Sequence, residues 1–104
     1  MAATFRIVYH TRVKSHLAAI ERKYHVMIRQ HIEVQLSSEP DMVTRNRKPL
    51  VAPLAFEATW EIRFGPSNRF RVFYEVDRDT MKVNVLAIGE KKNNRLLIAG
   101  EEVF

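Results

Sequence analysis

The stretch that decides the fold runs from Trp60 to Glu90 and reads WEIRFGPSNRFRVFYEVDRDTMKVNVLAIGE. Apolar and polar side chains alternate along 60–64 and 69–77, which is typical of strands with one buried face. The turn-forming sequences Gly-Pro-Ser-Asn and Asp-Arg-Asp-Thr follow these runs, and a third run, 81–88, is apolar on both faces. We therefore predict a three-stranded antiparallel meander whose third strand lies at the centre of the sheet.

Alternation along the first two strands assigns their side chains to two faces of the sheet. The apolar side chains at even-numbered positions, Trp60 among them, form the core face. The opposite face carries Glu61, Arg63, Arg69, Arg71, Phe73, Glu75 and Asp77. Two interpretations of this face stay open: the arginines are solvated or paired with Glu61 and Glu75, or they bind an anionic ligand. Phe73 is the candidate for base stacking, because aromatic rings beside cations stack on nucleic-acid bases.

The chain before the meander combines a short strand with a helical region. Residues 5–9, Phe-Arg-Ile-Val-Tyr, are β-prone and form either an edge strand or a central one. Apolar residues then recur at helical spacing in two stripes, Val13, Leu17, Ile20 and Tyr24, and Ile28, Ile32 and Leu36. The stripes predict two helices, or one helix with a break near residue 24. We predict an α+β fold in which an N-terminal strand and two helices, a helical hairpin, precede the meander, which forms a small twisted sheet.

Two further segments have no clear period. The connection from Glu39 to Ala58 contains three prolines, and a connection of about twenty residues is more often functional or mobile than idle. It carries the basic residues Arg45, Arg47 and Lys48, either as a solvated loop or as phosphate contacts. At the C-terminus, 96–98 can form a last strand and 99–104 a tail or a turn of helix.

The length and composition of the chain limit the class of protein to which it can belong. The chain has 104 residues, 46% hydrophobic and 28% charged, so we predict one globular domain over residues 1–104. It has no cysteine, and no apolar run long enough for a membrane span or a signal core, so we expect a cytoplasmic protein with no membrane partner. All four histidines lie in the N-terminal third without metal-ligand spacing, so we expect no metal ion and no cofactor.

The net charge of +5 favours a polyanionic partner. Between residues 45 and 95 there are eleven Lys and Arg residues against six Asp and Glu residues. The positive excess therefore lies mainly in the predicted sheet and its flanking loops, where a nucleic acid would bind.

The order of elements resembles that of the RelE/ParE superfamily, the bacterial toxins of type II toxin–antitoxin pairs. The resemblance is carried by WEIRF at 60–64, RFRVFYEVD at 69–77, VLAIGEKKN at 85–93 and RNRKPL at 45–50. It covers essentially the whole chain in order, and the middle strand is its most specific part. The resemblance implies a RelE-like fold and a cognate antitoxin as partner.

The resemblance also implies an activity. In RelE-like toxins the sheet face holds messenger RNA on the ribosome and promotes attack of a ribose 2′-hydroxyl on the adjacent phosphate, which needs cations at the phosphate and groups that move protons. The resemblance places the catalytic cations at Arg63, Arg71 and Lys91, Arg71 opening the family's R-x-x-Y stretch. The substrate-binding surface would then be completed by Arg45, Arg47, Lys48, Arg69, Phe73, Lys92 and Arg95.

The chain departs from the RelE pattern in its groups for proton transfer. Glu61 stands where RelE has a lysine, apolar residues near Leu97 stand where RelE has a tyrosine, and no tyrosine follows Tyr74. Glu61 is the remaining candidate for a general base. Three functions therefore stay open: an mRNA endoribonuclease acting with the ribosome, a ParE-like inhibitor of DNA gyrase, and a non-catalytic relative that binds its antitoxin.

Overall fold

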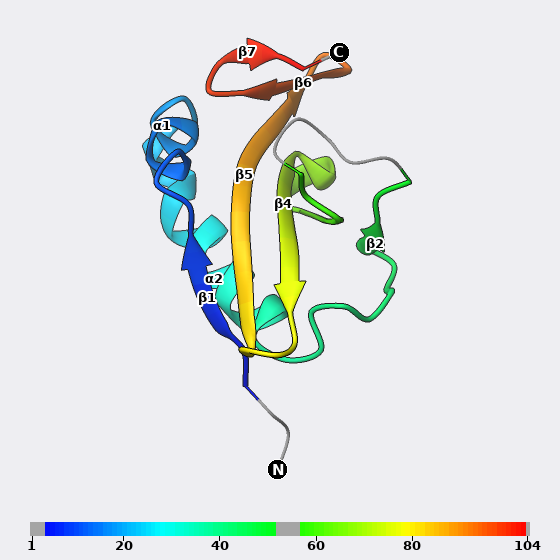
Figure 1. Cartoon of the computed structure of the whole chain (residues 1–104). Helices are drawn as coiled ribbons and strands as arrows, with labels where there is room; N and C mark the ends of the chain where they lie inside the picture. Colours follow the sequence, from blue (N-terminus) through cyan, green and yellow to red (C-terminus); the bar gives the residue numbers. More distant parts are fainter. Residues whose placement is uncertain (1–3, 52–56, 104) are drawn as a thin grey trace.

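One twisted sheet with helices on one side makes up the protein (Figure 1). The structure is a computed structural model and describes residues 4–51 and 57–103. Its elements are β1 (Arg6–Tyr9), α1 (Val13–Ala18), the 3₁₀ turn η1 (Arg22–Tyr24), α2 (His25–Leu36), β2 (Arg47–Pro49), β3 (Trp60–Phe64), the 3₁₀ turn η2 (Pro66–Asn68), β4 (Phe70–Asp77), β5 (Lys82–Lys92), β6 (Arg95–Ile98) and β7 (Glu101–Glu102). Within the described residues no helix has the length and apolar character needed to cross a bilayer.

The predicted meander is present as β3, β4 and β5. Trp60 pairs with Tyr74 and Phe64 pairs with Phe70, as the antiparallel prediction requires. Gly65 starts the connection between these strands with φ 84°, a conformation that glycine adopts without strain. β5 is the central strand, as predicted, because it pairs with β4 on one side and with β1 and β6 on the other (Figure 1). β1 runs parallel to β5.

The sheet is larger than predicted, with seven strands among residues 4–51 and 57–103 in place of the N-terminal strand and three-stranded meander. β2 forms inside the connection 39–58 and pairs with β3, while β6 and β7 continue the sheet beyond β5. The pattern did not indicate β2 because this strand has only three residues and ends in Pro49, which lacks a ladder donor. β6 confirms the last strand expected at 96–98, and 101–102 form a further strand rather than a tail.

The helical region contains two helices, as predicted, but only α2 is long, so the pair differs from the expected helical hairpin. The second stripe is confirmed, because Ile28, Ile32 and Leu36 are buried along α2. α1 has only six residues, and the chain then leaves helical geometry at Glu21 (φ −51°, ψ 132°) before η1 begins. So short a helix is not stable alone, and α1 packs against β5.

Two buried polar side chains are satisfied within the main core between helices and sheet. The hydroxyl of Tyr74 donates to the carbonyl oxygen of Pro40 at 2.7 Å, and His16 Nδ1 accepts the backbone N–H of Ile88 at 3.1 Å. Burial, followed by the positive charge of Arg12 and by a neighbouring histidine, lowers the pKa of His16. The imidazole therefore stays neutral at pH 7 and able to accept this bond.

A β-bulge in β5 interrupts the alternation of its side chains. Tyr74 pairs with Val85, whereas Phe73 pairs with Ala87, so Leu86 has no partner on β4. An unpaired extra residue shifts the side-chain alternation by one position. Side chains beyond the bulge therefore exchange faces relative to a regular strand.

This exchange of faces brings Lys91 to the side of the sheet that carries Arg71. Beyond the bulge Arg71 pairs with Gly89, and Lys91 lies two residues further along the same face. Ala87 also lies on this side of the sheet. Strict alternation would have placed it on the helical side with Val83 and Val85. The bulge is thus the local feature that positions Lys91.

A second, smaller core lies on the face opposite the helices. Phe73 is only 1% exposed and packs there with Ala58, Ala87 and Ile98. The prediction that Phe73 is available for base stacking is therefore wrong, because Ile98 of β6 and Ala58, two residues before β3, pack against its side chain. Alternation assigned its face correctly but did not reveal that this part of the face is covered.

Candidate functional site

Glu61, Arg63 and Arg71 form a charged cluster on the sheet face opposite the helices. Arg63 and Arg71 are direct cross-strand partners of β3 and β4. Arg63 Nε donates to Glu61 Oε1 at 2.6 Å, and Arg71 Nη1 lies 4.0 Å from Glu61 Oε2. Like charges placed opposite each other on a sheet repel, and the carboxylate shared between these two arginines offsets that repulsion.

Arg71 is the more confined of the two arginines. It is 8% exposed, and its Nε donates to the carbonyl oxygen of Asn68 at 3.2 Å. Burial and then the charge of Arg63 lower the pKa of Arg71, while Glu61 acts in the opposite direction. Arginine remains charged at neutral pH, so the lowered pKa means that this guanidinium is incompletely compensated by negative charge. An anion bound beside Arg71 would supply the missing compensation.

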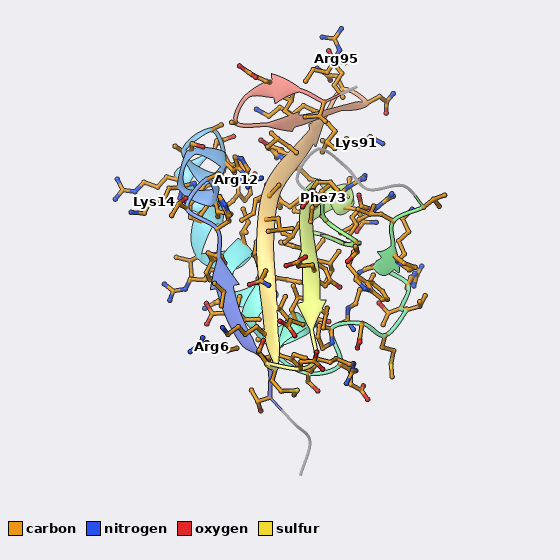
Figure 2. The ribbon with its side chains drawn as sticks, viewed as in Figure 1. Arg6, Arg12, Lys14, Phe73, Lys91 and Arg95 are labelled. Carbon is orange, nitrogen blue, oxygen red and sulfur yellow. The ribbon has the colours of Figure 1, made fainter. Side chains whose placement is uncertain are left out.

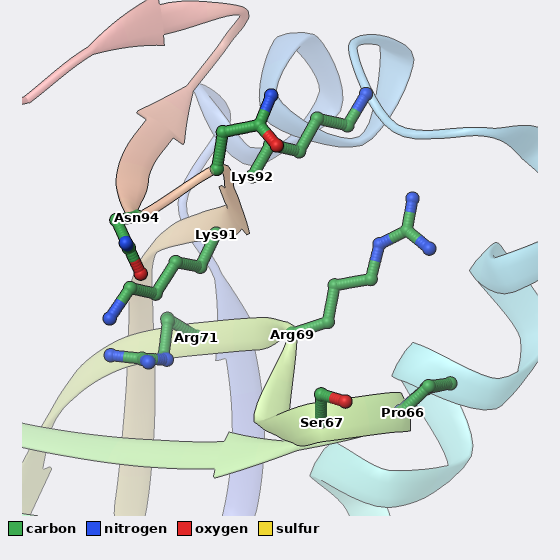
Figure 3. Close-up of a pocket in the computed structure, with 8 residues that line it drawn as sticks. Pro66, Ser67, Arg69, Arg71, Lys91, Lys92 and Asn94 are labelled. Carbon is green, nitrogen blue, oxygen red and sulfur yellow. The ribbon is translucent and has the colours of Figure 1, made fainter.

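An open pocket of about 670 Å³ lies beside Arg71 and Lys91. It is lined by Pro66, Ser67, Arg69, Arg71, Lys91, Lys92, Asn93 and Asn94. Figure 3 shows that the side chains of Arg71 and Lys91 extend in the same direction, with Asn94 beside them. Four of the described lining residues are cationic and none is acidic, so the arrangement favours an anionic ligand. We call this space the anion pocket.

A smaller pocket of about 110 Å³ lies beside Arg63. Its lining consists of Arg45, Asn46, Lys48, Arg63 and Asn68. The structure thus brings Arg45 and Lys48 of the basic loop next to Arg63. Asn68 joins the two spaces, because it lines the smaller pocket and its carbonyl oxygen holds Arg71 of the anion pocket.

Arg47 has a structural position that the predicted role in substrate binding does not fit. It is 6% exposed, and its guanidinium donates to the carbonyl oxygens of Glu39 at 2.7 Å, Gln35 at 3.0 Å and Met42 at 3.3 Å. Gln35 belongs to the last turn of α2, whose carbonyl groups lack intrahelical partners and carry partial negative charge. Arg47 therefore ties β2 to the end of α2, which corrects its assignment to the ligand surface.

Arg69 lines the anion pocket, but its side chain is held by groups on the helical side. Its Nε donates to Glu90, its guanidinium lies 4.8 Å from the ring centroid of Tyr24, and Glu21 lies 3.8 Å from its Nη2. Figure 3 shows Arg69 extending away from Arg71. The Glu90 contact raises the pKa of Arg69. The positive charge of Arg69 is therefore largely balanced by negative groups within the protein, unlike that of Arg71.

Lys92 and Arg95 lie at the hairpin between β5 and β6, where the two residues pair. Lys92 lines the anion pocket and lies 3.7 Å from Glu90. Arg95 is exposed at the far end of the hairpin and lines none of the described pockets that contain Arg63, Arg71 or Lys91. Arg95 is thus a predicted substrate-binding residue that the fold leaves outside the cluster, as it does Arg47 and Phe73.

Asn93, Asn94 and Ser67 line the anion pocket but were absent from the sequence prediction. The signal was present as Asn-Asn between two basic strand ends, since two-residue hairpin turns favour asparagine where φ is positive. Asn93 and Asn94 have φ of 50° and 63°. They lie on a turn and not on a strand face, so the alternation of strand side chains does not indicate them.

The described lining of the two pockets includes no His, Tyr, Asp or Glu. Glu61, in contact with Arg63, is the carboxylate that lies beside these cations. In residues 4–51 and 57–103 no three His, Asp or Glu side chains are grouped to hold a metal ion. The arrangement is suited to binding and stabilising negative charge, with Glu61 as the group able to exchange a proton.

Comparison with known proteins gives a likeness among solved structures. No family model and no curated protein matches the sequence. Among solved structures, the fold is similar to a chain of the RelBE2 toxin–antitoxin complex from Mycobacterium tuberculosis, with a TM-score of 0.69 and 20% sequence identity. The match covers 86% of this chain and 93% of that chain. The likeness confirms the RelE-like fold expected from the order of elements.

Proposed function

We propose that this protein is the toxin of a type II toxin–antitoxin pair and cleaves messenger RNA with the ribosome. The observation that carries the proposal is the convergence of Arg63, Arg71 and Lys91, three cations from different strands, on one open face of a RelE-like fold. Phosphate binding requires such cations, and their positions are fixed by the sheet before any ligand arrives. The net charge and the adjoining basic loop support a polyanionic substrate.

In the proposed reaction a ribose 2′-hydroxyl attacks the adjacent phosphorus. The bond from phosphorus to the 5′-oxygen of the next nucleotide breaks and that oxygen takes up a proton from water, which leaves a 2′,3′-cyclic phosphate and a 5′-hydroxyl. Arg71 and Lys91 stabilise the charge that develops on the phosphate oxygens, a contribution that is usually the largest single one in such sites. Neither metal nor oxidant is needed for the atoms to balance.

Glu61 accepts the proton of the 2′-hydroxyl in this proposal. Its carboxylate oxygen Oε1 accepts a hydrogen bond from Arg63 Nε at 2.6 Å. A phosphate that takes over the hydrogen bonds of Arg63 frees one carboxylate oxygen of Glu61 for proton transfer. This exchange of partners links substrate binding to the availability of the base.

The proposed partner is a cognate antitoxin that covers the anion pocket. An acidic segment bound there would compensate Arg71 and Lys91 and exclude RNA. Coexpression with the product of the adjacent gene should therefore restore growth and leave Arg71 inaccessible to a ligand. If that product neither binds the purified protein nor restores growth, the partner proposal is contradicted.

Induction in bacteria tests the proposed function. We expect growth arrest with new messenger RNA 5′ ends, and a loss of about 100-fold or more in cleavage for Arg71→Ala, the effect typical of removing one group that stabilises developing charge. Arg6→Ala is the matched control, because Arg6 is exposed at the end of the molecule opposite Lys91 (Figure 2). Growth arrest without new 5′ ends, or equal effects of the two variants, would contradict the proposal, and inhibited DNA supercoiling would point to gyrase instead.

A further inference from the structure

The turn between β5 and β6 projects two amide side chains into the anion pocket. Lys92 and Arg95 pair across the hairpin, so Asn93 and Asn94 form a two-residue loop. Both have positive φ, 50° and 63°, which is the geometry of a type I′ turn. This turn is short and its backbone is fixed by the pairing of the flanking strands. The amides are therefore held at the rim of the pocket and not on a long loop.

The two amides lie next to the cations of the anion pocket and can contact a different part of a bound nucleotide. Figure 3 shows the Asn94 amide beside the end of the Lys91 side chain, on the side toward which Arg71 extends. Ser67 lies on the opposite rim, also with positive φ (54°). A phosphate held by Arg71 and Lys91 therefore has the Asn93–Asn94 turn directly next to it. A nucleotide base attached beside that phosphate would lie close to the turn.

The chemistry of asparagine suits reading a base. A guanidinium or an ammonium group binds any phosphate and carries no sequence information. An amide presents two donors and an acceptor, which match the edges of unpaired bases. Within the described residues neither asparagine side chain makes a hydrogen bond to the protein, so both amides are available to a ligand.

We infer that Asn93 and Asn94 set the sequence preference of the nuclease by reading the base next to the phosphate that Arg71 and Lys91 hold. This inference rests on the proposed function and identifies the substrate more closely. The substrate is a single-stranded RNA segment whose base edge is free of a pairing partner. The turn determines which base is preferred, whereas the cations bind the phosphate and support catalysis.

The test compares RNA cleavage sites in cells that express the wild type, Asn93→Gly, Asn94→Gly or Asn94→Asp. Glycine keeps the positive φ of the turn and removes the amide, and aspartate keeps the shape but only accepts hydrogen bonds. Gln30→Ala removes an exposed amide on α2, outside the anion pocket, and is the control. Thermal unfolding of each purified variant establishes that the fold is retained.

We expect the wild type to show a base preference beside the cut, and at least one glycine variant to lose about fivefold or more of it, as expected for one lost side chain–base contact. Asn94→Asp should shift the preference toward guanine, whose N1–H and 2-amino groups can both donate to the carboxylate. Unchanged preferences in all the turn variants, with cleavage still dependent on Arg71, would overturn the inference and leave the proposed function standing. Folded turn variants that no longer cleave would also overturn it, since the turn would then act in catalysis. A wild type without cleavage would overturn both.

Discussion

Replacing Arg47 with alanine is expected to destabilise the fold strongly, although this residue was predicted from sequence to bind substrate. Its guanidinium makes two hydrogen bonds of 3.0 Å or less, to the carbonyl oxygens of Glu39 and Gln35, and a longer one to Met42. Hydrogen bonds to charged groups contribute about 1.5–3 kcal/mol each, so losing the two short ones costs about 3–6 kcal/mol. Domains of this size have only about 5–15 kcal/mol of stability.

Thermal unfolding measures this loss directly. For a domain of about 100 residues each kcal/mol lowers Tm by about 4–8 °C, so Arg47→Ala should melt at least about 12 °C below the wild type. Arg45→Ala is the matched control, because Arg45 is exposed two residues away on the same loop, and surface substitutions change stability by only about 0.5 kcal/mol. If the two variants melt within about 4 °C of each other, Arg47 does not stabilise the end of α2 and the structural assignment is refuted.

Three further predictions concern the core and its turns. Tyr74→Phe leaves the buried carbonyl oxygen of Pro40 without its 2.7 Å bond and should cost about 1–3 kcal/mol in urea unfolding; an unchanged midpoint would contradict this. Because burial lowers the pKa of His16 from 6.5, the unfolded state binds more protons below that pH, so stability should fall as pH drops from 6.5 through the lower folded-state pKa. His16→Asn can accept the same backbone hydrogen bond without titrating, so the stability of this variant should depend less on pH. An equally steep fall of stability with pH would contradict the role of His16. Gly65→Ala should destabilise the β3–β4 connection, since a Cβ would lie 2.6 Å from the Phe70 ring and φ is 84°; an unaltered Tm is the opposing result.

The meander and the long helix were predictable because each buries one face in a regular period. Ile28, Ile32 and Leu36 of α2 recur at helical spacing, and the core positions of β3 and β4 alternate. The number of strands was less predictable. β2 and β7 have three and two residues, too few for a period to show, and their pairing depends on strands distant in sequence.

The candidate site was predictable in part. Alternation alone places Arg63 and Arg71 on one face, and cross-strand pairing makes them neighbours. Lys91 joins them only because Leu86 is bulged, a feature that no local pattern of apolar residues specifies. The resemblance to RelE-like proteins placed Lys91 at the site, whereas strict alternation of β5 would have assigned it to the helical face.

Burial explains the remaining errors at the site. Phe73 and Arg47 lie in segments whose composition suits a ligand surface, yet tertiary packing covers both. An arginine followed by a lysine reads as a solvated pair, and nothing in the sequence shows that the carbonyl oxygens at the end of α2 lie within reach of Arg47 and not of Lys48. Such contacts arise between segments that only the folded chain brings together.

Cleavage of a defined messenger RNA in a translating bacterial extract tests whether a ribose 2′-hydroxyl attacks a phosphate that Arg71 and Lys91 hold. A single 2′-deoxynucleotide placed immediately 5′ of the mapped cut removes the attacking hydroxyl without altering the phosphate that Arg71 and Lys91 hold. We expect purified wild-type protein to cut the all-ribose RNA to give a 2′,3′-cyclic phosphate and to leave the deoxy-substituted position intact. Cutting should be lost with Arg71→Ala but not with Arg6→Ala. Continued cleavage at the deoxy position, or cleavage that is indifferent to Arg71, would contradict the proposed reaction.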